Sequence, residues 1–130
     1  MARHFAPILV KSGQNAVFAS ISARVGSIGD NVMGGWYSYR AAKAAQNMLT
    51  KNLSIELKRR SRGKVAAIGL HPGTVRTDLS APFSKNVKPE MLFEADQAAS
   101  MLLDVTFSAR DDPAGMTGKV YDYAGEVIEW

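Results

Sequence analysis

Residues 65–73 read Val65-Ala66-Ala67-Ile68-Gly69-Leu70-His71-Pro72-Gly73, and this stretch decides the fold. Its first six residues form a short apolar run, which is typical of a strand buried inside a sheet. Gly63 lies just before the run and His71-Pro72-Gly73 ends it, so the strand is punctuated on both sides. Strands covered on both faces are characteristic of parallel sheets.

The segments on either side of this strand alternate between helix and strand. Upstream, residues 36–60 are rich in Ala, Leu, Lys, Gln and Glu and contain neither Pro nor Gly, which predicts the clearest helix. Before the long helix, the sequence predicts the end of a helix at residues 3–10 and a buried strand at 16–21. After the central strand, it predicts a loop from His71-Pro72-Gly73 to about Lys88, a helix from Pro89 through Val105, a loop at 111–115 and a short strand at 119–123. Alternation of this kind predicts an α/β fold with a parallel sheet and crossover helices. With about three strands, residues 1–130 correspond to a single domain that forms one half of a doubly wound sheet.

Composition narrows the class of protein. The chain has 130 residues, of which 46% are hydrophobic and 22% charged, and this composition excludes a disordered tail. The sequence contains no apolar run of about eighteen residues, so it predicts no membrane-spanning helix. The net charge is only +4, and the densest basic stretch, residues 58–64, closes the predicted long helix, so we expect no nucleic-acid partner. There are no cysteines, the two histidines have no metal-ligand cluster around them, and no signal peptide is recognisable. A cytoplasmic protein without a metal is therefore expected.

Tyr39 and Lys43 are the first candidates for chemistry. They are four residues apart on the predicted long helix, so their side chains share one face. A neighbouring ammonium favours an ionised phenolate, and such a tyrosine can exchange a proton with a hydroxyl or carbonyl of a substrate. The same pair also occurs as an ordinary aromatic beside a solvated lysine, so the spacing alone does not establish a site.

The surrounding segments support the catalytic interpretation. A glycine-rich loop, residues 26–35, separates the tyrosine from the strand that ends at Ser20-Ile21-Ser22, and the next strand ends at His71-Pro72-Gly73. In a parallel sheet these segments meet at the carboxyl ends of the strands, where the ligand sites of α/β folds form.

This combination resembles the short-chain dehydrogenase/reductase family over essentially the whole chain. The stretches from Ser22 to Asn31 and from Gly34 to Arg40 are most similar to the branch of sniffer-like and C-factor-like carbonyl reductases. The resemblance implies the carboxyl-terminal, catalytic half of a Rossmann-type fold and an oxidoreductase that uses NADP or NAD on a small carbonyl or alcohol substrate. It also implies a homo-oligomer, because the corresponding helix builds a dimer interface in the family.

The resemblance assigns roles by position. Tyr39 is expected to be the catalytic acid/base, and Lys43 to assist it while binding the nicotinamide ribose. Pro72, Gly73, Val75 and Thr77 match the segment that packs on the nicotinamide and bonds its amide.

The catalytic serine departs from the family pattern. The commoner pattern places it three residues before the glycine matched by Gly26, and that position is occupied by Ala23. Ser22 is the candidate that would polarise the carbonyl, and Ser27 is the alternative.

The dinucleotide fingerprint is missing. The sequence has no glycine-rich turn after a first strand, which would let the backbone approach a pyrophosphate at a helix N-terminus. The amino-terminal dinucleotide-binding half is thus expected to be absent, and dinucleotide binding by this chain alone to be weak or nil. Two functions remain open: a reductase half that is inactive as an isolated fragment, or a truncated, non-catalytic relative that acts as a dimerisation or interaction module.

Overall fold

The computed structural model describes residues 1–82 and 84–130. The main sheet has four strands, in the order β1 (Ala16–Ile21), β2 (Val65–His71), β5 (Val120–Asp122) and β6 (Val127–Ile128). The first three are parallel, which confirms the α/β prediction, and β6 runs antiparallel to β5. The antiparallel strand is too short to produce a sequence pattern of its own.

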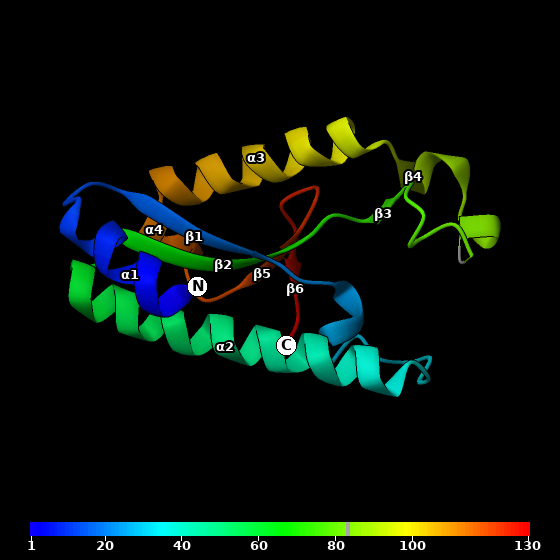
Figure 1. Cartoon of the computed structure of the whole chain (residues 1–130), viewed down its shortest axis with the longest axis horizontal. Helices are drawn as coiled ribbons and strands as arrows, with labels where there is room; N and C mark the ends of the chain where they lie inside the picture. Colours follow the sequence, from blue (N-terminus) through cyan, green and yellow to red (C-terminus); the bar gives the residue numbers. More distant parts are fainter. Residues whose placement is uncertain (83) are drawn as a thin grey trace.

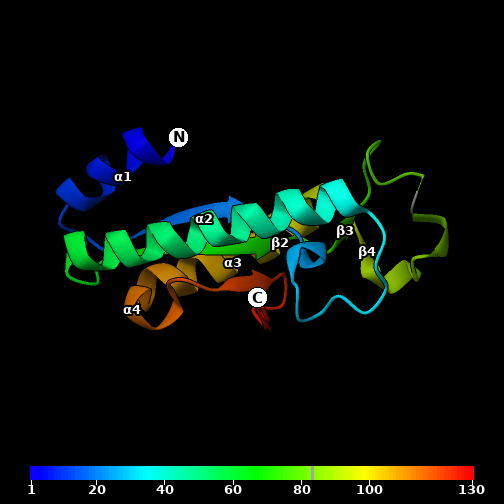
Figure 2. The same ribbon diagram turned by 90° about the horizontal axis from the view of Figure 1, so that it is seen from below.

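Helices cover both faces of this sheet (Figure 1). α1 (Ala2–Lys11) and α2 (Tyr37–Ser61) lie on one face, and α3 (Ala95–Asp111) lies on the other (Figure 2). Each face has its own apolar cluster. The α1/α2 side contains Ala6, Leu57, Val65 and Ala67, and the α3 side contains Ile68, Leu70, Val105, Ala109 and Tyr121.

β2 is the central strand, and its first six residues are all buried. Consecutive residues of a strand point to opposite faces, so Val65 and Ala67 serve one cluster while Ile68 and Leu70 serve the other. This two-sided burial is why an unbroken apolar run encodes the strand. β1, by contrast, lies at the edge of the sheet, and Ile21 is 53% exposed.

The long helix matches its prediction to within one residue at each end. α2 ends where Arg62 and Gly63 adopt left-handed backbone conformations, with φ of 55° and 83°. Lys58, Arg59 and Arg60 occupy its last turn, where cations interact favourably with the negative end of the helix dipole.

The prediction of a helix starting at Pro89 is wrong. Pro89–Met91 forms a single 3₁₀ turn (η3), and Leu92–Phe93 then forms a short strand, β4, before α3 begins. β4 pairs in parallel with β3 (Thr74–Val75), inside the predicted loop. Packing explains the difference, because the Phe93 ring is buried and meets Tyr123 edge to face at 4.6 Å between centroids.

Two short helices also fall in predicted loops. Ser84–Asn86 forms a 3₁₀ turn, η2, and Pro113–Met116 forms α4. The Asp112 side chain accepts a hydrogen bond from the backbone N–H of Gly115 and so caps α4.

None of the helices in the described part of the chain combines the length and the apolar character that crossing a membrane requires.

Candidate active site

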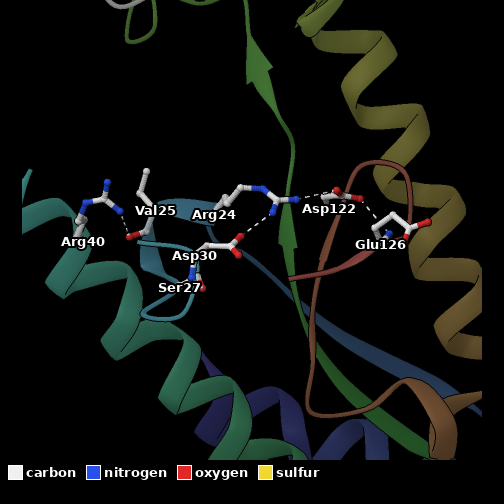
Figure 3. A network of polar contacts seen from close by, with 7 residues as sticks. All are labelled: Arg24, Val25, Ser27, Asp30, Arg40, Asp122 and Glu126. Carbon is white, nitrogen blue, oxygen red and sulfur yellow. Dashed lines mark hydrogen bonds and ion pairs between the residues drawn. The ribbon is translucent and has the colours of Figure 1, made fainter. Parts of the chain in front are cut away.

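Three successive left-handed residues turn the chain into α2. Gly34, Gly35 and Trp36 have φ of 64°, 69° and 46°. The Arg40 side chain fixes this turn, because its Nε donates to the carbonyls of Gly34 and Gly35, each at 3.2 Å. Its Nη1 donates to the Val25 carbonyl at 3.1 Å, which ties the first turn of α2 to the loop after β1 (Figure 3). The start of the helix that carries Tyr39 is therefore well defined.

Lys43 reaches the carboxyl end of β1. Its Nζ donates to the Ile21 carbonyl and to the Gln46 side-chain oxygen, both at 3.1 Å, and Gln46 Nε2 donates to the same carbonyl at 2.8 Å. Tyr39 lies one turn earlier on α2 and is 49% exposed. The structure thus places an ammonium group at the strand end and a half-exposed phenol one helical turn from it.

Ser22, the candidate serine, follows β1 and is only 3% exposed. Its hydroxyl donates to Asn47 Oδ1 at 2.5 Å, and its backbone N–H donates to the Leu70 carbonyl at 2.7 Å. Ser27 is also buried, and its hydroxyl accepts a hydrogen bond from the Asp30 backbone N–H at 3.0 Å. Both candidate hydroxyls are therefore engaged within the protein.

Residues 72–77 lie where the sequence places them, directly after β2. Gly73 has φ of 74°, and a Cβ there would come within 2.7 Å of the Phe93 ring and 3.0 Å of the Tyr123 ring. Val75 continues into β3 and accepts a hydrogen bond from the Ser80 hydroxyl at 2.6 Å. Thr77 is exposed, and its Oγ1 accepts one from the Ser80 backbone N–H at 3.3 Å.

A charged bridge centred on Arg24 joins the loop after β1 to the turn after β5. Arg24 Nη1 lies 2.7 Å from Asp30 Oδ2, and Nη2 lies 3.0 Å from Asp122 Oδ2 (Figure 3). The other carboxylate oxygen of Asp122 accepts the backbone N–H groups of Ala124 and Glu126, each at 3.0 Å. The sequence gives no local sign of this bridge, because Arg24 and Asp122 are 98 residues apart.

Burial lowers the pKa of His71 from 6.5 to about 4, with a further lowering from the Arg24 guanidinium and an opposing effect of Asp122. Its Nδ1 has no hydrogen-bond partner within the described residues. The imidazole at the end of β2 is therefore neutral at neutral pH.

Asn47 lies next to the candidate site, where it binds Ser22, and the sequence did not predict it. It lies one turn after Lys43 on α2 and is 3% exposed. The signal that could have found it is its register, since residues 39, 43 and 47 recur every four positions along one side of the helix. In residues 1–82 and 84–130, no group of three or more His, Asp or Glu side chains is placed to hold a metal ion.

Comparison with known proteins gives a consistent result. A family model described as short chain dehydrogenase matches residues 1–88. The C-signal protein of Myxococcus xanthus is 32% identical over 123 residues, which cover 86% of this chain and 60% of that protein.

Solved structures of carbonyl reductases are also similar to this chain. The NADPH-bound carbonyl reductase from chicken fatty liver is 26% identical, with a TM-score of 0.77 over 99% of this chain and 51% of that chain. The carbonyl reductase Sniffer of D. melanogaster, at 24% identity, has the same fold, with a TM-score of 0.76 over the same shares. The chain thus spans about half the length of the proteins that it matches.

Proposed function

The chain belongs to the short-chain dehydrogenase family, and we propose that it carries the proton-transfer part of a site for carbonyl reduction or alcohol oxidation. The observation that supports this most directly is the placement of Lys43, whose ammonium group is held at the Ile21 carbonyl, with Tyr39 one turn away. The proposed substrates are small carbonyl compounds or alcohols.

Tyr39 is the proposed acid/base. During reduction its phenol gives a proton to the substrate oxygen, and during oxidation the phenolate takes the proton back. The Lys43 ammonium stabilises the phenolate by its positive charge. An ammonium has three N–H donors, and Ile21 and Gln46 accept two of them, so the third can bind a ribose hydroxyl.

The residues after β2 fit the nicotinamide end of NADP or NAD. Gly73 has no room for a side chain, because a Cβ there would meet the Phe93 and Tyr123 rings, so the turn after β2 packs closely on these two rings. Pro72 and Val75 would pack on that ring, and Thr77 would bond its amide. The bound cofactor would supply the hydride. The sequence offers no glycine-rich turn for the pyrophosphate, so we expect this chain alone to bind the dinucleotide weakly.

Carbonyl polarisation is the remaining role. Ser22 and Ser27 are the candidates, but both are buried, and Ser22 would have to release the hydrogen bond that it donates to Asn47 to reach a substrate. Tyr39 and Lys43 face no such requirement and form the centre of the proposal.

The test is a titration of the purified chain with reduced nicotinamide mononucleotide and, separately, with NADPH, followed by NMR and calorimetry. We expect both ligands to bind with dissociation constants in the millimolar range, which corresponds to a binding free energy of about 4 kcal/mol. The reason is that only the nicotinamide-ribose part, which the two ligands share, has a site on this chain. Signals of Lys43, Gly73 and Thr77 should shift, and Lys43→Met should abolish these shifts. Lys51→Met, on the same helix, is the control.

Micromolar binding of NADPH would show that the chain contains a pyrophosphate site and would overturn the weak-binding expectation. If neither ligand moves the signals of Lys43 and Gly73, the proposed catalytic function is wrong for this chain.

A second candidate function is an interaction module, and one observation favours it. Large apolar side chains are exposed on α1 and α2, the layer on one face of the sheet. They are Phe5, Ile8, Met48, Leu49 and Ile55. A groove of about 630 Å³ runs between α1, β1 and α2 and is lined by residues that include Phe18, Leu49 and Leu53. A second copy of this chain is the proposed occupant.

A further inference from the structure

The bond between Ser22 and Asn47 is the most buried polar contact near the candidate site. Both residues are 3% exposed, and the hydroxyl of Ser22 donates to Asn47 Oδ1 at 2.5 Å. The bond joins the end of β1 to the middle of α2, two elements 25 residues apart in sequence. A buried polar group that loses its partner is costly, so this contact constrains how α2 lies on the sheet.

The alternation of side chains along the extended chain explains why Ser22 faces α2. Val17 packs against the cluster under α3, whereas Phe18 packs against the cluster under α1 and α2. Ala23 continues the extended backbone, with φ of −153° and ψ of 147°. Ser22 therefore shares the face of Phe18, and Ala23 faces the opposite way. Because the two side chains face opposite ways, the Ser22 hydroxyl does not reach the space that a serine at position 23 would face.

The bond is also next to the contact that holds Lys43. Ile21 precedes Ser22, and Lys43 precedes Asn47 by one turn, so the two contacts connect β1 to α2 at successive levels. The Lys43 contact uses a long, flexible side chain. The Ser22–Asn47 contact uses two short side chains, and short side chains lose less rotational freedom when they are fixed.

We propose that Ser22 and Asn47 are positioning residues, which set the height and rotation of α2 on β1 and thereby place Lys43 and Tyr39. In this role the Ser22 hydroxyl stays with Asn47 and does not contact the substrate. The inference rests on the proposed function for its catalytic meaning, but the placement itself is measurable without cofactor or substrate.

The test follows the NMR signals of the Tyr39 ring and the Lys43 side chain, assigned with Tyr39→Phe and Lys43→Met. Ser22→Ala and Asn47→Leu are each expected to shift both signals. Ser22→Thr, which keeps the hydroxyl, should restore them. Ser54→Ala is the matched control: Ser54 is equally buried on α2, but its hydroxyl donates to Lys51 within the same helix, so its loss should lower stability without moving Tyr39 or Lys43.

If Ser22→Ala moves the Tyr39 and Lys43 signals no more than Ser54→Ala does, the bond only stabilises the fold and the proposal is overturned. If a single variant does not fold, the double variant Ser22→Ala/Asn47→Leu leaves no orphaned partner and gives the same readout. Failure of mononucleotide binding combined with shifts in Ser22→Ala would remove the proposed function and leave the positioning role. Mononucleotide binding without shifts in Ser22→Ala would support the proposed function and overturn the positioning role.

Discussion

At the scale of single residues, His71 makes stability depend on pH. Its pKa is lowered to about 4 in the folded protein, whereas the unfolded chain has the ordinary value of 6.5. As pH falls below 6.5, the unfolded state binds a proton that the folded state does not, so stability decreases until about pH 4. We expect a total loss of about 3 kcal/mol from this group. The measurement is urea unfolding at a series of pH values.

His71→Gln should flatten this decline, because the titrating group is gone. His4→Gln, on the exposed side of α1, is the matched histidine substitution away from the end of β2. An unchanged slope in His71→Gln between about pH 7 and pH 5 would contradict the prediction.

The serine assignment shows where sequence reasoning at this scale stops. Spacing makes Tyr39 and Lys43 candidates, and the family resemblance adds Pro72, Gly73, Val75 and Thr77. In the structure the pair lies on α2 and the other four residues follow β2. Spacing cannot reveal which of two neighbouring residues faces the helix. The identity of Ser22 makes it a candidate, and its direction becomes clear only from its bond to Asn47.

At the scale of elements, Gly26 lets the loop after β1 approach α2. A Cβ on Gly26 would lie 2.7 Å from the Lys43 backbone carbonyl carbon and from Lys43 Cβ, and 3.0 Å from the Ala44 nitrogen. Gly26→Ala would therefore push the helix away from the loop. We expect a loss of about 1–3 kcal/mol in the free energy of unfolding, measured by chemical denaturation, and a shift of the Lys43 NMR signals.

Gly13 provides a contrast with a different physical cause. It has φ of 67°, and a Cβ at this position would meet no atom within 4 Å, so Gly13→Ala should cost roughly 1 kcal/mol through backbone strain. The Lys43 signals should stay in place. Equal shifts of these signals in both variants would show that Gly26 has no special relation to α2.

Long elements are predictable because their own sequence pattern and their packing agree. α2 is 25 residues long and rich in strong helix formers, and β2 is apolar throughout its buried length. The segment 89–93 is not predictable, because a proline followed by an acidic residue favours a helix start, while the burial of Phe93 against Tyr123 selects a strand. β6 depends in the same way on its neighbour β5.

At the scale of the whole molecule, the exposed apolar layer predicts self-association. Leu49 is 67% exposed and lines the groove between α1, β1 and α2. We expect a dimer or larger oligomer by light scattering, because burying such a surface is favourable. Leu49→Glu should shift the mass toward the monomer, since a charge would be buried in the interface.

Leu103 offers the control, because it is 51% exposed on α3, on the opposite face of the sheet. Leu103→Glu should leave the measured mass unchanged. A monomeric mass for the unmodified chain at all concentrations would rule out the proposed interface.

The Arg24 bridge has a consequence for the synthesis of the protein. Its partner Asp122 is synthesised 98 residues after Arg24. The Gly29 backbone N–H donates to the Trp130 carbonyl at 2.9 Å, and this partner is synthesised later still. Contacts between such distant parts of a chain form late, because a long loop must close first. While the chain is still emerging, β1 and α2 can already pair with β2, but the loop between them lacks its anchors. The part of this loop around Arg24 and Gly29 therefore takes its final shape only after Asp122 and Trp130 have been made, whereas the contacts of Arg40 can form earlier.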